Sequence, residues 1–123
     1  MPQYAALIYE QGDPDWSVLD TADKQATMAA YGAFGAAAAA VLRGGAALYP
    51  TTTGTTVRVS GGKGGQMVVS DGPFAETKEV LTGFYQLECA DLDEAIAWAA
   101  RIPAAWTGVV EVRPIIEFGG GAA

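Results

Sequence analysis

Histidine is absent from the 123-residue sequence, and cysteine occurs once, as Cys89. Without histidine, the chain cannot form a Ser-His-Asp or Cys-His catalytic site by itself, and zinc sites built from cysteine and histidine are excluded as well. A single cysteine allows no disulfide within the chain, which suits a reducing compartment. Transition-metal binding would need a cluster of carboxylates, and no suitable spacing of Asp and Glu occurs. We therefore expect no metal, flavin or haem cofactor.

Basic residues and long apolar runs are also scarce. Seven Lys and Arg stand against 14 Asp and Glu, so the formal net charge is −7. Nucleic-acid binding needs clustered basic residues that neutralise phosphates, and an anionic membrane surface attracts the same residues. No apolar run is long enough to cross a membrane, and the N-terminus lacks the basic segment of a signal peptide. The sequence thus predicts a soluble, cytoplasmic protein that binds neither nucleic acid nor membranes.

Apolar residues, in contrast, make up 50% of the sequence. A chain of this length and composition can bury a core without the help of metals or disulfides. The length fits one domain, which we assign to residues 1–118. The glycine-rich end, 119–123, is expected to be a flexible tail.

Periodicity and turn signals divide the domain into strands and helices. The predicted strands are 4–9, 46–49, 55–60, 66–70, 83–89 and 108–118, and the predicted helices are 22–42 and 92–102. This order is that of a ferredoxin-like βαββαβ fold of the α+β class, with an inserted hairpin. Two helices cover only one face of such a sheet. The other face carries enough apolar side chains to need a partner, so we expect a homodimer.

Polar residues mark where both helices begin. Asp20 or Thr21 offers an N-cap oxygen to the first helix, and Asp91, with Glu94 three residues on, caps the second. The face of the first helix that packs on the sheet is predicted from apolar residues at helical spacing, namely Met28, Tyr31, Ala38, Val41 and Leu42, with Phe34 at its margin.

The segment Val69-Ser70-Asp71-Gly72-Pro73-Phe74-Ala75-Glu76-Thr77-Lys78-Glu79 resembles the defining segment of the YCII-related, or DGPF-domain, family. The match extends over nearly the whole chain, through residues 7–9, 28–31, 83–85, 91–95, 98–103 and 110–114. The resemblance implies a bacterial protein and a dimeric α/β barrel, in which two ferredoxin-like sheets pack through their open faces. It also implies a functional link to an alternative sigma factor. Some relatives are thought to use a His-Asp pair, of which this chain retains only the Asp, at Asp71.

Asp71 is the candidate catalytic residue. In the Asp71-Gly72-Pro73 turn, its carboxylate either projects into the barrel cleft as a general acid or base, or organises the turn by accepting backbone N–H groups. Phe74, Thr77 and Lys78 follow in a polar segment. They form either the rim of the cleft, where Lys78 positions an anionic ligand, or a solvated loop that Phe74 anchors to the core.

Three further residues are candidates for the cleft. Glu111 and Arg113 alternate with two valines in an extended strand, so they point to the opposite face from the valines. There they bind a polar ligand or pair across the dimer, or else form an exposed ion pair of little energetic value. Tyr85 either lines an aromatic pocket and assists Asp71, or belongs to the core.

Two functions of different classes follow from these residues, because the fold alone does not decide the function. The first is a small dimeric binding or accessory module linked to sigma-factor regulation, with a small molecule as its possible ligand. The alternative is an enzyme of the lyase or isomerase type, in which Asp71 transfers a proton in the cleft. A purely structural role, with an empty cleft, is a third interpretation.

Overall fold

Four antiparallel strands form the central sheet of the computed structural model, which describes residues 1–119. The spatial order is β2-β5-β1-β6. The strands are β1 (Gln3–Gln11), β2 (Leu42–Ala47), β5 (Glu79–Glu88) and β6 (Val109–Pro114). With one helical connection after β1 and another after β5, this arrangement confirms the predicted ferredoxin-like α+β fold. The predicted tail at 119–123 lies, apart from Gly119, outside the described residues.

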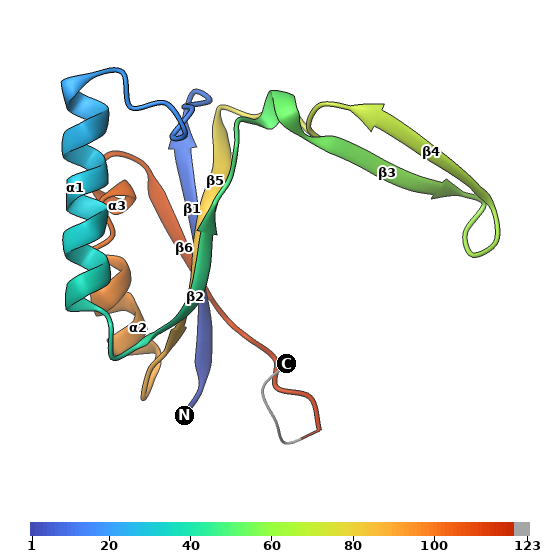
Figure 1. Cartoon of the computed structure of the whole chain (residues 1–123). Helices are drawn as coiled ribbons and strands as arrows, with labels where there is room; N and C mark the ends of the chain where they lie inside the picture. Colours follow the sequence, from blue (N-terminus) through green and yellow to red (C-terminus); the bar gives the residue numbers. More distant parts are fainter. Residues whose placement is uncertain (120–123) are drawn as a thin grey trace.

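Within residues 1–119, three α-helices cover one face of this sheet (Figure 1). They are α1 (Ala22–Ala37), α2 (Leu92–Ala99) and the short α3 (Ala104–Thr107). Side chains alternate along β1, so that Tyr4, Ala6 and Ile8 are buried beneath the helices, while the residues between them are only half-buried. We call the second face, opposite the helices, the open face. Within residues 1–119, no helix has both the length and the apolar character needed to span a membrane.

Side-chain caps fix where the helices begin. The Thr21 hydroxyl accepts a hydrogen bond from the backbone N–H of Lys24 at 3.1 Å, so Thr21 rather than Asp20 is the N-cap of α1. Asp20 instead forms an ion pair with Lys24. The Asp91 carboxylate accepts the backbone N–H of Glu94 at 2.9 Å, as predicted for α2. Each cap satisfies a donor that the first helical turn leaves without a partner.

The first helix is shorter than predicted. It ends at Ala37, and Leu42 to Ala47 pair with β5 as strand β2. Alanine propensity favours a longer helix, but pairing with β5 outweighs it. The packing face also differs from the prediction: Phe34, expected at its margin, is only 4% exposed, whereas Met28 is 36% exposed.

Tertiary pairing shifts three further boundaries. β5 begins at Glu79, four residues before the predicted strand 83–89, because its first residues pair with the end of β1. The second predicted helix, 92–102, ends at Ala99 and is followed by α3. β6 is an edge strand that ends at Pro114, which agrees with the positions that proline tolerates in sheets.

A separate two-stranded hairpin projects from the molecule on the side of the open face (Figure 1). It consists of β3 (Thr55–Ser60) and β4 (Gln66–Asp71), and the short 3₁₀-helix η1 (Thr51–Thr53) precedes it. The predicted hairpin is thus confirmed. Every residue of the two strands is exposed except Thr56, which is half-buried.

Candidate functional site

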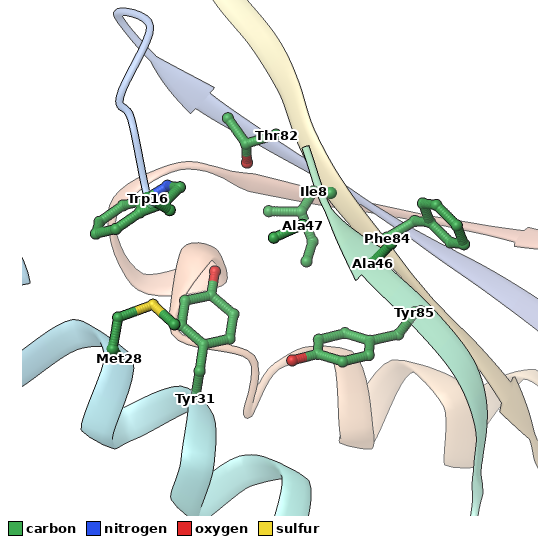
Figure 2. A pocket seen from close by; sticks show the side chains of 11 residues that line it. Ile8, Trp16, Met28, Tyr31, Ala46, Ala47, Thr82, Phe84 and Tyr85 are labelled. Atoms are coloured by element: carbon green, nitrogen blue, oxygen red, sulfur yellow. The ribbon is translucent and has the colours of Figure 1, made fainter. Parts of the chain in front are cut away.

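A cavity of about 200 Å³ lies between α1 and the central sheet (Figure 2). Its wall is largely apolar and combines side chains from the helix, the sheet and the loop at 12–21. The lining residues are Ile8, Trp16, Met28, Tyr31, Gly45, Ala46, Ala47, Thr82, Gly83, Phe84 and Tyr85. None of them carries a charge, so the cavity favours a neutral ligand. The Phe84 ring itself points away from the cavity (Figure 2).

Two tyrosine hydroxyls supply hydrogen-bonding groups to the cavity. Figure 2 shows the Tyr85 hydroxyl pointing toward α1 and the Tyr31 side chain rising from α1 beside it. The Tyr85 ring packs on Phe34 with a centroid distance of 5.2 Å, which fixes its orientation. Burial raises the pKa of both tyrosines, and the Glu10 carboxylate raises that of Tyr31 further. Both phenols therefore stay protonated at neutral pH and can donate a hydrogen bond to a ligand.

A β-bulge in β5 shapes the end of the cavity. Ile8 pairs with Gly83 and Tyr9 with Leu81, so Thr82 is the extra residue of the bulge. Its side chain is 7% exposed and faces the cavity (Figure 2). On the neighbouring strand, a Cβ atom at Gly45 would lie 2.8 Å from the Tyr85 ring. Glycine at position 45 therefore leaves room for the aromatic ring that lines the cavity.

The loop at 12–21 places Trp16 over the cavity, and two contacts hold it there. The indole Nε1 of Trp16 donates a hydrogen bond to the Glu10 carboxylate at 2.9 Å. Asp13 accepts hydrogen bonds from both the backbone N–H and the hydroxyl of Thr51, at 2.9 and 2.5 Å, and these bonds lower the pKa of the Asp13 carboxyl. The loop is thus tied both to β1 and to the start of η1.

Glu10 is a buried carboxylate beside this site, with a side chain only 8% exposed. It borders a shallow groove of about 450 Å³ on the far side of Trp16, together with Trp106 and part of α1. Its position follows from the alternation along β1, since Glu10 continues the series Tyr4, Ala6, Ile8 on the helix-covered face. The strand predicted from the sequence ends at residue 9, so its alternation was not extended to Glu10.

Asp71 lies at the end of β4 on the projecting hairpin, whereas Tyr85 lies in the central sheet (Figure 1). One chain therefore does not bring the two side chains together. Among the described residues, the hydrogen bonds that hold the Asp71-Gly72-Pro73 turn are made by groups other than the Asp71 carboxylate. The Gly72 N–H donates to the Gly54 carbonyl at 2.7 Å, and the Thr56 hydroxyl donates to the Gly72 carbonyl at 3.0 Å.

The other candidates from the polar segment lie near the base of the hairpin. Phe74 is 75% exposed and packs against the Arg58 guanidinium of β3 at 5.1 Å, rather than anchoring the segment to the core. The Thr77 hydroxyl donates to the Glu79 carbonyl at 2.5 Å, which stabilises the start of β5. Lys78 is exposed. None of these three side chains lines the cavity at α1.

Glu111 and Arg113 lie on the open face of β6. Arg113 Nε is 3.4 Å from Glu111 Oε2, and both side chains remain exposed. Val110 and Val112 pack against the core on the opposite face, as the predicted alternation requires. Of the seven sequence-predicted site residues, only Tyr85 lines the cavity between α1 and the sheet.

The polar side-chain groups that line the cavity are suited to hydrogen bonding with a ligand. These groups are neutral hydroxyls. Cys89, which does not line the cavity, has a thiol pKa that burial and the nearby Glu94 raise, so this thiol stays protonated. In the part of the chain that the structure describes, no three His, Cys, Asp or Glu side chains gather to hold a metal ion.

Comparison with known proteins gives one family and one relative. The model of the YCII-related domain matches residues 3–119. An uncharacterized protein of Rhizobium meliloti (strain 1021) is 51% identical over 72 residues. That match covers 57% of this chain and 56% of the relative, so the chain spans about half the length of the curated protein that it matches.

Proposed function

We propose that this chain, which belongs to the YCII-related domain family, is a binding module for a small neutral molecule in the cavity between α1 and the sheet. One observation carries the proposal: an apolar cavity of about 200 Å³ that contains two protonated tyrosine hydroxyls and is covered by a tethered tryptophan. Ligand sites of proteins typically combine such apolar walls with a few polar groups that orient the ligand.

The volume limits the ligand to about one ring. An apolar cavity of about 150 Å³ in a protein interior is large enough for benzene. The cavity beneath α1 therefore accommodates a single ring with one or two small substituents. Tyr31 and Tyr85 supply hydroxyl groups for an alcohol, phenol or carbonyl substituent, and a charged substituent would lose its hydration without gaining a counter-ion.

The proposed assembled state is a homodimer that forms through the open face. Register places Leu7, Tyr9, Leu81, Phe84 and Val109 on that face. Of these, Leu81 and Phe84 are each 38% exposed, and Val109 is 48% exposed. A contiguous apolar surface of this kind is typical of a subunit interface. The link to an alternative sigma factor and the enzyme that uses Asp71 stay predictions.

Methyl-labelled protein titrated with phenol and with toluene tests the binding site by NMR. We expect shifts at the Ile8 and Met28 methyl groups, and tighter binding of phenol than of toluene by about three- to tenfold, the value of one hydrogen bond. Tyr85→Phe should reduce that difference. Ala47→Leu, which fills part of the cavity, should weaken both ligands by about tenfold or more.

Two variants outside the cavity serve as controls. Ala37→Leu adds the same side chain at the exposed end of α1, and Asp71→Asn removes the carboxylate from the hairpin. Both should bind phenol like the wild type. The proposed site is wrong if neither phenol nor toluene shifts the NMR signals of the cavity methyl groups. It is also wrong if the Ala47→Leu variant binds both probes as tightly as the wild type. If Asp71→Asn alone loses binding, the alternative cleft at Asp71 is favoured instead.

A further inference from the structure

The β3–β4 hairpin has two faces of different character. Cross-strand register places Val57 opposite Val69 and Val59 opposite Met67 on one face. We call these four residues the apolar face of the hairpin. The other face carries Thr56 opposite Ser70 and Arg58 opposite Val68, together with polar residues at the turn. An alternation this regular is typical of a strand pair with one buried face.

Within the described chain, nothing buries that face. Val57, Val59, Met67 and Val69 are 49–66% exposed. A two-stranded hairpin without further packing is marginally stable in water. Because the sequence keeps four large apolar residues on one face and, apart from Val68, polar residues on the other, the hairpin has the pattern of an element with one covered face.

A second copy of the same chain is the partner that fits best. The hairpin leaves the sheet on the side opposite the helices, so the hairpin and the open face lie on the same side of the molecule (Figure 1). A two-fold dimer in which the hairpin of each copy reaches the open face of the other would bury both surfaces on each chain.

Charge supports the same partner. The whole chain has a net charge of −7, so two copies repel each other through most of their surface. The four residues of the apolar face of the hairpin are uncharged, and the Glu111 and Arg113 charges on β6 compensate each other at 3.4 Å. These two groups of residues therefore bring no net charge to the contact, and Asp71, which lies on the same face of the hairpin, adds one carboxylate at its base.

We propose that the β3–β4 hairpin is a dimerisation arm whose apolar face packs on the open face of a second copy of this chain. This inference rests on the proposed homodimer and adds the element that holds it together. It is independent of ligand binding beneath α1.

Adjacent valines on opposite faces of β4 provide a matched test. Val69→Asp places a carboxylate on the apolar face, and Val68→Asp places the same group on the opposite face. The two valines are similarly exposed, Val68 at 44% and Val69 at 52%. In sedimentation equilibrium of the full chain, we expect Val69→Asp to raise the dimer dissociation constant about 100-fold or more, because burying an unpaired carboxylate is strongly unfavourable. Val68→Asp should change it by less than about fivefold.

A variant of the open face separates this inference from the homodimer itself. Leu81→Asp should disrupt the dimer in either case. If Leu81→Asp gives monomers while Val69→Asp dimerises like the wild type, the homodimer stands and the arm is wrong. If the wild type is monomeric at all concentrations, both proposals fail.

Contacts across the dimer give a readout that does not depend on the folding of variants. In a mixed dimer of labelled and unlabelled chains, isotope-filtered NOE spectra report only intermolecular contacts. The arm predicts NOEs from the Val57 and Val69 methyl groups to Leu7 or Leu81 of the second copy. A stable dimer that lacks these NOEs overturns the proposal.

Discussion

At the scale of single residues, the protonation of Tyr31 links the cavity to the stability of the fold. Burial and the Glu10 carboxylate raise its pKa above the ordinary value of about 10. The native state thus holds the phenol proton more tightly than the unfolded chain does. The stabilisation is fully present below pH 10 and is lost as the pH rises through the native pKa.

Tyr31→Phe should therefore make the protein less sensitive to alkali. Above pH 10, the free energy of unfolding of the wild type should fall more steeply with pH than that of the variant. One proton sets an upper limit of about 1.4 kcal/mol per pH unit for this difference, and solvent screening of the half-buried phenol brings it below that limit. Urea denaturation at a series of alkaline pH values measures both slopes.

Tyr49→Phe is the matched control, because Tyr49 is 68% exposed. Its slope should equal that of the wild type. Equal slopes for Tyr31→Phe and the wild type would contradict the role assigned to burial and to Glu10.

Period-two alternation was sufficient to predict the orientation of Glu111 and Arg113, and the same rule applied to β1 would have found Glu10. The cavity is different. Trp16 reaches it from a loop, and Thr82 reaches it only because the bulge in β5 inserts one residue. No local pattern marks a bulge of this kind, so the sequence did not reveal the cavity that Tyr85 lines.

At the scale of elements, local polar signals set the starts of the helices. For α2, the Asp91 carboxylate accepts the Glu94 N–H, and the Glu94 carboxylate in turn accepts the Ala90 N–H at 2.8 Å. This reciprocal arrangement is a close variant of the capping box. Because α2 has only eight residues, a large share of its backbone donors depends on the cap.

Asp91→Ala should lower the free energy of unfolding by about 1 kcal/mol, the typical contribution of an N-cap. Asp93→Ala is the control, because Asp93 lies in the first turn of the same helix and contributes only through the helix dipole. It should lower stability by no more than about 0.5 kcal/mol. Urea midpoints with unchanged m-values measure both effects, and equal losses would show that the Asp91 bond has no special role.

The ends of the elements were less predictable than their starts. Leu42 to Gly45 follow an alanine-rich helix and have no strand propensity of their own, yet they pair with β5. Glu79 to Leu81 likewise become a strand because the end of β1 lies beside them. In both places, long-range hydrogen bonding determines the structure, and a window of sequence contains no information about its partner.

At the scale of the whole molecule, the order of helices and strands was enough to predict the ferredoxin-like arrangement and its uncovered face. That order also placed the hairpin correctly between β2 and β5. What it did not predict is the separation of the candidate residues, since Asp71 and Phe74 lie at the base of the projecting hairpin while Tyr85 lies beneath α1. The chain therefore presents two distinct regions, the cavity beneath α1 and the projecting β3–β4 hairpin.

If the arm packs on a second copy, the stability of the hairpin must depend on protein concentration, whereas that of the central sheet need not. Opening of the exposed hairpin in a monomer costs little, because few buried apolar contacts hold it. Hydrogen exchange followed by mass spectrometry or NMR, at concentrations far below and far above the dimer dissociation constant, resolves the two regions. The amides of β3 and β4 should exchange rapidly in the dilute sample and slowly in the concentrated one.

The amides of β1 and β5, which pair within the subunit, provide the internal reference and should be protected in both samples. Val69→Asp should keep the hairpin in rapid exchange at the high concentration, while Val68→Asp should follow the wild type. Hairpin amides that exchange at the same rate in both samples would contradict the arm, whether that rate is fast or slow. A fast rate at both concentrations would mean that the dimer leaves the hairpin free, and a slow rate at both would mean that the hairpin is stable without a partner.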